Sequence, residues 1–302
     1  MIVVRIVGGL GNQLFMYATG RALALRCKTE LLLDTRSGAS ADSFFRRHFG
    51  LHDFTIEARH AVGNEIWYLP LLSSPTLGWI TRQILKAMSD QLPWRSQSYL
   101  CERDPCMLDE RLFQQRIGDT LYLDGYWQDE RYFIDAEATV RSDLRLTQTH
   151  DADLSHLAQD IRSCNSVSVH ARRLHQVPST VNQPDPSVSS LPIEYYQWAI
   201  QRIASRVRNP TFYCFSDEPG WLQKHLECRY PVHFPVAGRS SEDGFGDFWL
   251  MRQCRHHILA NSTFSWWSAW LADSPDKIVI CPDLRKWNQI TATPPSWEVA
   301  PP

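Results

Sequence analysis

The sequence lacks the signals that mark most nucleic-acid-binding and membrane-spanning proteins. It has no polybasic arm and no acidic tail: among 302 residues, Lys and Arg number 31 and Asp and Glu 33. The charges are spread evenly, so that each half of the chain is close to neutral. This balance argues against partners held by net charge, whether nucleic acid or a membrane surface. No apolar run reaches the roughly 18 residues of a membrane-spanning helix.

The sequence also lacks closely spaced cysteine motifs. None of the eight cysteines forms a C-x-x-C pair, which argues against a zinc ribbon or a redox dithiol. Several lie in apolar segments, such as Cys214 in TFYCFSD and Cys281 in IVICPD, so we expect buried free thiols in a reducing compartment. The N-terminal MIVVRIVGG has neither a basic region nor a cleavage site, and we expect a first strand there rather than a signal peptide.

The chain opens with a strand, a turn, a helix and a second strand. The β-branched run 2–7 ends at the glycines of 8–11, and Asn12 is the predicted N-cap of a helix over 13–27. A short apolar run at 30–34 predicts the second strand. Units of this kind build parallel sheets. Residues 35–120 show no clear period, and we expect helices and long loops there, followed by a strand at 121–127.

The second half alternates regularly between strands and helices. The polar stretch 149–163 is the best candidate for a domain boundary. Five strands are predicted after it, at 166–170, 211–216, 232–236, 257–260 and 277–281. Helices are predicted at 192–207, 219–227, 247–256 and 263–271. The fold class is therefore α/β with a doubly wound parallel sheet, and ligands of such sheets bind at the carboxyl ends of the strands.

The turn GGLGNQ at 8–13 is the first candidate site. No Lys follows its glycines, which excludes a P-loop, and Leu14 occupies the third glycine position of a dinucleotide-binding motif. Two interpretations stay open for this turn. It is either a tight strand-to-helix connection or a set of backbone N–H groups that binds an anion or a sugar hydroxyl.

Further candidates follow the predicted strands of the second half. Arg172 can pair with a phosphate, or it can be an ordinary solvated strand-end residue. Asp217 can accept from ribose or a base, or cap the next helix. Ser262 and Thr263 can form a phosphate cradle at a helix start, or act as a simple N-cap. Asp247 can read a guanine edge, or merely stabilise the start of its helix.

No strong metal-binding pattern accompanies these residues. The D-x-D spelling at Asp151 and Asp153 lies in a polar linker, where helix capping is the simpler interpretation. His256 and His257 are adjacent, so their rings point to different faces. An arginine, a hydroxyl-rich helix start and two carboxylates without a metal cluster suit a nucleotide diphosphate whose charge is balanced by Arg172.

Five segments spread over nearly the whole chain form a distinctive series: GGLGNQLFMYATGRALA (8–24), GYWQDERYF (125–133), VSVHARR (167–173), FYCFSDEPGW (212–221) and DFWLMRQCRHHILANSTFSWWSAWL (247–271). In sequence and in order they resemble the bacterial α-1,2-fucosyltransferases of glycosyltransferase family 11. The resemblance implies a GT-B-like architecture of two Rossmann-like domains with parallel sheets facing a cleft. Residues 1–150 would form the acceptor-side domain and residues 151–302 the domain that binds GDP-fucose.

The resemblance also implies an activity. L-fucose would pass from GDP-β-L-fucose to the 2-hydroxyl of a terminal galactose in a glycan, with inversion and without metal or other cofactor. No nucleic-acid partner is implied. Surface-glycan or O-antigen assembly in the cytoplasm would follow, on the inner face of the membrane if the acceptor is lipid-linked.

Roles for individual residues are implied in the same way. His170 and Asp247 would read guanine, and Arg172 would bind the β-phosphate as a catalytic residue. The other donor-binding residues would be Asn12 at the fucose, Asp217 at the nucleoside, Arg173, Asn261, and the pyrophosphate contacts Ser262, Thr263 and Phe264.

One departure from the family affects catalysis. The family usually reads H-x-R-R-G-D-Y, whereas Leu174 and His175 replace the Gly-Asp pair here. His175 is either a replacement base or a surface residue of an altered loop. This departure keeps two alternatives open: a GDP-fucose transferase with another acceptor or linkage, and a catalytically silent relative that binds a nucleotide sugar or glycan. A metal-dependent transferase would require metal at residues 151–153.

Overall fold

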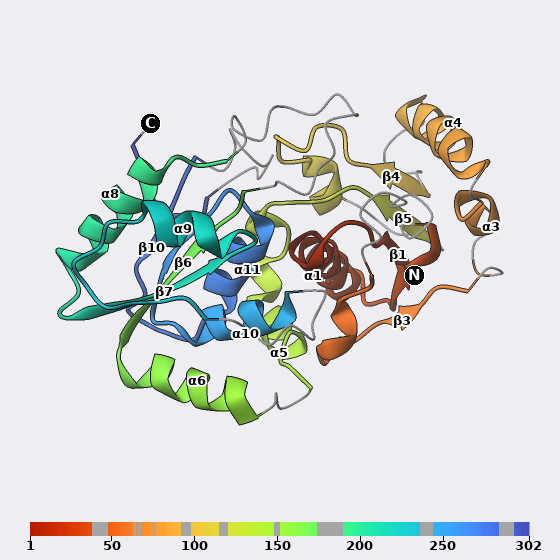
Figure 1. The fold of residues 1–302 in the computed structure, drawn as a ribbon. Coiled ribbons are helices and arrows are strands. Elements are labelled where there is room, and N and C mark those ends of the chain that lie inside the picture. The colour runs from red at the N-terminus through yellow and green to blue at the C-terminus, as the bar shows by residue number, and fades with distance from the viewer. Residues whose placement is uncertain are drawn as a thin grey trace. The chain divides into compact units, whose positions relative to one another are not determined.

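The chain folds into two compact units, Met1–Gln148 and Thr149–Pro302, each built on one parallel sheet (Figure 1). The computed structural model describes residues 1–37, 48–62, 65, 68–74, 76–91, 98–114, 120–147, 152–173, 190–235, 244–283 and 293–301. Among the helices in these ranges, none is long and apolar enough to cross a membrane. All eight cysteines are free thiols, of which Cys214, Cys254 and Cys281 are buried and Cys106 is exposed. The expectation of buried thiols therefore holds for only part of the set.

The first unit contains a five-stranded sheet in the order β3-β2-β1-β5-β4. Its strands are β1 (Ile2–Arg5), β2 (Leu31–Asp34), β3 (Arg59–His60), β4 (Tyr99–Cys101) and β5 (Leu121–Asp124). Its α-helices are α1 (Leu10–Arg26), α3 (Leu69–Leu72), α4 (Gly78–Gln91) and α5 (Glu137–Asp143). Short 3-10 helices are η1 (Leu51–Asp53), η3 (Glu110–Gln114), η4 (Glu130–Tyr132) and η5 (Ile134–Ala136).

Helices cover both faces of this sheet. Val3, Leu32 and Tyr122 point into a core that α3 and α4 close. Val4 points to the other face, toward α1, where Gly20 allows the helix to approach closely. A Cβ on Gly20 would lie 2.3 Å from Cγ2 of Val4. The burial of alternate residues on both faces explains why these strands read as continuous apolar runs in the sequence.

The second unit contains a six-stranded parallel sheet in the order β11-β10-β9-β6-β7-β8. Its strands are β6 (Asn165–Ala171), β7 (Pro210–Ser216), β8 (Val232–His233), β9 (His256–Ile258), β10 (Val279–Cys281) and β11 (Glu298–Val299). Its helices are α6 (Ala152–Ser163), α8 (Ile193–Ala204), α9 (Pro219–His225), α10 (Phe245–Gln253) and α11 (Thr263–Leu271). Numbered along the unit, this is the order of a doubly wound nucleotide-binding sheet.

Alternation along β6 and β7 sends neighbouring residues to opposite faces. Val167 and Cys214 belong to the core under α8 and α9, whereas Tyr213 and Phe215 belong to the core under α6 and α10. The predicted α/β class with parallel sheets is confirmed in both units. The strand order reverses between the paired neighbours β6 and β9, which makes this position the topological switch point of the sheet.

Three expectations from the sequence need correction. Helix α1 begins at Leu10 with Gly9 as its N-cap, so Asn12 lies inside the first turn and does not cap the helix. The second unit has a sixth strand, β11, which pairs with β10 but spans only two residues. Residues 35–120 contain two short strands, β3 and β4, as well as helices. Strands of two or three residues are too short to show a period.

Candidate functional site

The switch point of the second sheet brings together the residues that follow β6, β7 and β9. Strand β6 pairs with β7 over its whole length and with β9 from Val167 to Val169. The segments after these strands therefore emerge side by side at the carboxyl edge of the sheet. These are the segments that carry the predicted Arg172, Asp217 and Ser262. Such an edge is where open α/β sheets bind their ligands.

Arg172 and Asp217 form an ion pair across this edge. Nε of Arg172 lies 3.5 Å from Oδ2 of Asp217, and the arginine side chain retains 35% of its exposure. The other carboxylate oxygen, Oδ1, accepts a hydrogen bond of 2.9 Å from the backbone N–H of Arg173. Asp217 thus fixes the chain at the end of β6 and holds the guanidinium of Arg172. It does not cap α9, whose N-cap is Glu218.

Arg173 points into the packing of the unit. Its guanidinium stacks on the ring of Trp221, 3.9 Å from the ring centroid. It also donates through Nη1 to the carbonyl of Leu191 at 3.3 Å, and Ser190 donates to the Arg173 carbonyl at 2.9 Å. These contacts anchor the residues on either side of 174–189 to each other. The predicted donor contact of Arg173 stays a prediction.

His170 is buried beside the start of α11. Its ring lies 5.6 Å from the ring of Phe264, and only 6% of the residue is exposed. Burial, reinforced by the nearby charge of Arg172, lowers the pKa of His170 to about 4. The imidazole is therefore neutral at pH 7. Its Nδ1 finds no hydrogen-bond partner among the described residues, so a polar atom is left over at this edge.

Asp247 lies in the first turn of α10. This helix starts after Gly244, which adopts a left-handed conformation with φ of 68° and lies beside the ring of Phe264. Phe264 also packs edge-on against Phe248 of the same helix, with ring centroids 5.3 Å apart. Burial raises the pKa of Asp247 to about 6. The ring of Phe264 thus connects His170 to the start of the helix that carries Asp247.

Helix α11 begins where the segment after β9 reaches the same edge. Ser262 is its N-cap, and its Oγ accepts from the backbone N–H of Phe264 at 3.3 Å. The hydroxyl uses a lone pair for this cap and keeps its own hydrogen for a further acceptor. Asn261 is buried and Thr263 is half-buried. The first turn of a helix offers N–H groups and a positive dipole end to an anion.

The tryptophans of α11 belong to the hydrophobic core. Trp266, Trp267 and Trp270 are 4% exposed or less. No group of three or more His, Cys, Asp or Glu side chains that could hold a metal ion occurs within the described part of the chain. The side chains of Asp151 and Asp153 and the predicted base His175 lie outside the described residues.

The first unit has its own switch point, between β1 and β5. The GGLGNQ turn follows β1, and residues 125–128 follow β5. The two segments meet where Nε2 of Gln128 donates to Oδ1 of Asn12 at 3.2 Å. Gln13 holds the turn from below, because its amide donates to the carbonyls of Gly8 and His48 at 2.8 Å and accepts from the N–H of Gly50.

Two residues at this second edge have no counterpart among the predicted site residues. Gln128 lies in the segment GYWQDERYF, which supported the family resemblance but received no role. Glu102 follows β4, and its carboxylate accepts from the backbone N–H groups of Tyr126 at 2.7 Å and Trp127 at 3.0 Å. The spelling GYWQ was the available signal for Gln128. Nothing in the sequence around Glu102 shows that it approaches β5.

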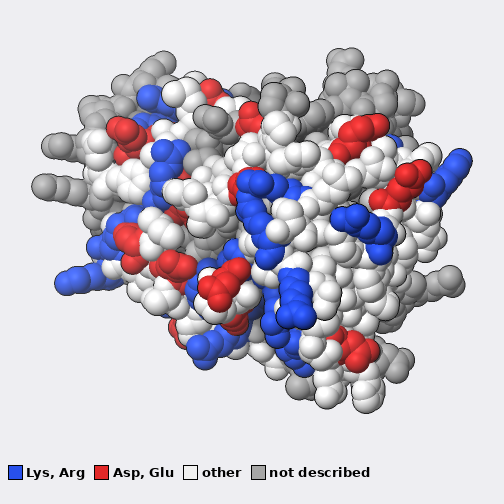
Figure 2. Space-filling model, turned by 90° about the vertical axis from the view of Figure 1, so that its left-hand side faces the viewer, with Lys and Arg blue, Asp and Glu red and all other residues white. Residues whose placement is uncertain are grey.

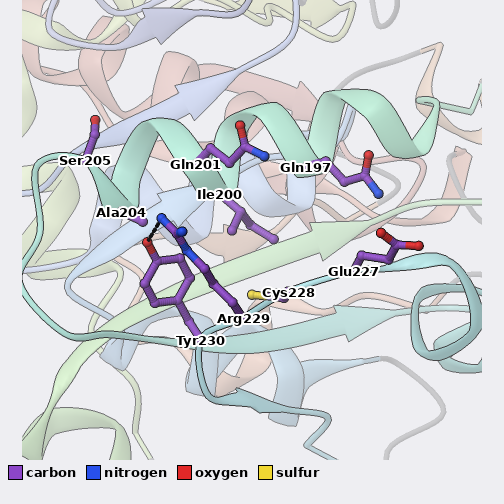
Figure 3. A pocket seen from close by; sticks show the side chains of 9 residues that line it. All are labelled: Gln197, Ile200, Gln201, Ala204, Ser205, Glu227, Cys228, Arg229 and Tyr230. Atoms are coloured by element: carbon purple, nitrogen blue, oxygen red, sulfur yellow. Dashed lines mark hydrogen bonds between the residues drawn. The ribbon is translucent and has the colours of Figure 1, made fainter.

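A groove of about 680 Å³ lies elsewhere in the second unit, between α8 and residues 227–230 (Figure 3). Gln197 and Gln201 of α8 and its C-cap Ser205 line the groove on one side, and Arg229 donates to the hydroxyl of Tyr230 at 3.0 Å. Residues 227–230 precede β8, so this groove is at the amino ends of the strands, away from Arg172. On the face drawn in Figure 2, basic and acidic side chains are interspersed.

Comparison with known proteins agrees with this geometry. The family model of Glycosyl transferase family 11 matches residues 1–291. The alpha-1,2-colitosyltransferase of Escherichia coli is 28% identical, over 98% of this chain and 98% of the relative. The bovine galactoside 2-alpha-L-fucosyltransferase SEC1 is 30% identical, over 72% of this chain and 64% of the relative.

A solved structure shares the architecture. The fucosyltransferase NodZ from Bradyrhizobium superimposes with a TM-score of 0.55 at 18% sequence identity, covering 92% of this chain and 94% of that chain. The GT-B-like fold class that the resemblance implied is confirmed by this similarity and by the two parallel sheets.

Proposed function

Because this chain belongs to glycosyl transferase family 11, and is thus a glycosyltransferase, we propose that it is a galactoside α-1,2-fucosyltransferase. It transfers L-fucose from GDP-β-L-fucose to the 2-hydroxyl of a terminal galactose, with inversion at the anomeric carbon and without a divalent cation. The product is a surface glycan of the O-antigen kind. The fucosyltransferase among the relatives supports the sugar and the linkage. Cytoplasmic location and peripheral membrane association stay predictions.

One observation carries the nucleotide part of this proposal. At the switch point of the second sheet, the half-exposed guanidinium of Arg172 is held by Asp217 beside the segment that leads into α11. Asp217 lies against the Nε side of this guanidinium, and 35% of the arginine side chain stays exposed. A guanidinium and a helix N-terminus that converge on one edge form a binding site for phosphate groups.

The chemistry follows from where charge develops. During transfer, the bond from the anomeric carbon to the β-phosphate oxygen breaks, and the acceptor oxygen attacks from the opposite face. Negative charge grows on the β-phosphate while the sugar becomes oxocarbenium-like. Arg172 and the start of α11, with Ser262, Thr263, Phe264 and the adjacent Asn261, oppose that charge. Preorganised contacts of this kind are among the largest contributions to catalysis.

The base-recognition part rests on the buried His170 and the half-buried Asp247. Guanine presents N–H donors on one edge, and the Asp247 carboxylate accepts such donors when ionised. The imidazole of His170 is neutral, and its Nδ1 has no hydrogen-bond partner among the described residues. This nitrogen can bond another polar atom of the base. We further propose that His175 takes the proton of the acceptor hydroxyl and that Arg173 and Asp217 keep the end of β6 in place.

A second donor is favoured by one specific comparison. The relative that aligns over 98% of the chain is a colitosyltransferase, and colitose is fucose without its 3-hydroxyl. A site that hydrogen-bonds a hydroxyl discriminates strongly against a substrate that lacks it, whereas the reverse discrimination is weak. Transfer of colitose from its GDP derivative is therefore the alternative function.

The test compares both donors directly. The purified protein is mixed with GDP-fucose or GDP-colitose and N-acetyllactosamine in the presence of EDTA, and GDP release and product linkage are measured. We expect faster release with GDP-fucose and an α-1,2-linked product. If GDP is released faster from GDP-colitose, colitose replaces fucose as the assigned donor sugar. GDP binding without any turnover on a panel of galactosides indicates a silent relative, and activity that requires added metal overturns the metal-independent mechanism.

A further inference from the structure

We propose that Glu102 is a positioning residue of the transfer reaction: it fixes the loop after β5 and, through Gln128, the side chain of Asn12. This inference rests on the proposed function and on the contact with the transferred fucose that the family resemblance implies for Asn12. Glu102 itself touches no substrate in this account. It acts within the first unit, at the switch point between β1 and β5.

The carboxylate of Glu102 clips two successive backbone N–H groups. Oε2 accepts from Tyr126 at 2.7 Å and Oε1 accepts from Trp127 at 3.0 Å. The backbone N–H of Glu102 in turn donates to the carbonyl of Asp124, the last residue of β5, at 3.0 Å. Glu102 is thus bound to β5 through its main chain and to the loop after β5 through its side chain. With 9% of the residue exposed, water competes little for these bonds.

The loop that Glu102 holds has a conformation that requires support. Gly125 lies so close to Glu102 that a Cβ there would be 2.4 Å from the Cβ of the glutamate. Trp127 has a φ of 54°, in the left-handed region that a bulky side chain rarely adopts. Its buried ring packs edge-on against Tyr132, with centroids 5.7 Å apart. The carboxylate bond to the Trp127 N–H holds the strained residue from the other side.

The strained residue sets the direction of Gln128. The Gln128 amide, in a residue only 5% exposed, donates to Oδ1 of Asn12 at 3.2 Å. Asn12 also lies against Gly8, whose φ is 78° and whose Cβ, if present, would be 2.9 Å from Nδ2 of Asn12. A continuous set of contacts therefore runs from Glu102 through residues 126–128 to the turn after β1. A change in the clip moves Asn12.

Only the ionised carboxylate can serve both N–H groups well, because protonation turns one oxygen into a donor. Burial, together with the nearby Asp109 and Asp104, raises the pKa of Glu102 to about 7, although the two backbone N–H bonds oppose that rise. The other titratable groups that face it are Tyr132, Cys101 and Cys106. Arg111 pairs with Asp109. The clip therefore loosens as the pH falls below about 7.

The experiment uses Glu102→Gln, which keeps the size of the side chain but replaces one acceptor by an NH₂ donor. Its matched control is Glu110→Gln, at an exposed residue of η3. For each protein we measure kcat and KM with saturating GDP-fucose and N-acetyllactosamine from pH 5.5 to 8.5, GDP affinity by calorimetry, and Tm. Asp247 is proposed to bind the donor, so its ionisation affects donor binding. With the donor at saturation, that effect does not contribute to kcat.

We expect Glu102→Gln to lower kcat about 10- to 100-fold, the scale of a small misplacement at a reacting centre, with GDP affinity within about twofold of wild type. Protonation of the proposed base His175 lowers kcat in acid in both proteins, so the diagnostic quantity is the ratio of wild-type kcat to variant kcat, which should fall as the pH is lowered below about 7. Gln128→Ala should lower kcat similarly, and the double variant should be no worse than either single one. If Glu102→Gln does not fold, kcat of Gln128→Ala relative to that of the wild type, measured over the same pH range, decides the question.

Three results would overturn the proposal: wild-type kcat in Glu102→Gln, a ratio of wild-type to variant kcat that does not change with pH, or wild-type kcat in Gln128→Ala. If the loss of kcat is accompanied by a lower Tm and a parallel loss of GDP affinity, Glu102 has a purely structural role. That result also rejects the proposal. Failure of the proposed function is a different observation, because the wild type itself would then neither bind GDP nor release it from GDP-fucose.

Discussion

The two switch points have the same architecture but use opposite kinds of chemistry. In the first unit, the segments after β1 and β5 meet through neutral amides, Asn12 and Gln128, and the charged residues nearby are paired inside the protein. In the second unit, the segments after β6 and β9 bring a guanidinium and a helix N-terminus to the surface. The parallel sheet fixes the location of both edges, and the loop residues decide what each edge can bind.

The exposure of the charges makes this difference concrete. Asp124 in the first unit is 3% exposed and lies between Arg5 and Arg82, which are 6% and 31% exposed. Arg172 in the second unit retains 35% of its side-chain exposure beside one aspartate. A buried, paired charge serves the fold, whereas a guanidinium that keeps part of its exposure can bind an anion. Under the proposed function, the first edge would contact the sugar and the second the diphosphate.

The largest expected effect tests the structural half of this comparison. Asp124→Ala leaves Arg5 and Arg82 without their shared carboxylate, and breaking a buried pair in this way costs about 3–5 kcal/mol. We expect a clear fall in Tm and a loss of folded protein, measured by differential scanning calorimetry. An unchanged Tm would show that these charges are not needed for the fold.

Arg172→Ala tests the functional half. We expect transfer to fall roughly 10²- to 10³-fold, because a preorganised contact to the developing charge is lost, while Tm stays within a few degrees. GDP release from GDP-fucose is the measurement, and Arg208→Ala, at an exposed residue of the same unit, is the control. Near-normal turnover by a folded variant would remove Arg172 from the mechanism.

A smaller effect is expected at the aspartate that holds this arginine. Asp217→Asn keeps an acceptor for the N–H of Arg173 but removes the charge opposite Arg172. We expect transfer to fall about tenfold because the guanidinium is less well placed, and the loss should be absent when Arg172 is already alanine. Additive losses in the double variant would mean that Asp217 acts independently of Arg172.

The smallest effect concerns stability and its pH dependence. The pKa of Asp247 is raised by burial from 3.8 to about 6, so the folded state holds a proton that the unfolded state has released between these values. The stability associated with this proton is present below about pH 4 and lost as the pH rises through 6.

Asp247→Asn removes that loss. Its Tm should exceed that of the wild type at pH 7.5 and match it at pH 4, while its affinity for GDP falls. A Tm difference that is the same at both pH values would contradict the assignment, and so would unchanged GDP affinity.

The fold of the second unit could be predicted from the sequence because its signals are local. Helix α11 spans Thr263–Leu271, with Ser262 as its N-cap, since a capping hydroxyl stands directly before a continuous apolar run. The prediction failed for Asn12, because Gly9 already offers the extended conformation of an N-cap. It also failed for β3, β4 and β11, which are defined by pairing with neighbours and not by their own pattern.

The candidate site shows the same difference between local sequence signals and contacts of distant residues. Arg172 and Ser262 were found because each directly follows a predicted strand. The pairing of Arg172 with Asp217, the stacking of Arg173 on Trp221 and the clip formed by Glu102 join residues that are far apart in the sequence. Contacts of this kind depend on the three-dimensional approach of strands, which no local pattern records.

The most direct test of the account is calorimetric titration of GDP into the wild type and into Arg172→Ala, both in EDTA. The account predicts binding to the wild type without a divalent cation and a marked loss of affinity in the variant. No heat with the wild type in EDTA, or equal affinity in the two proteins, would contradict a diphosphate site at the carboxyl edge of the second sheet.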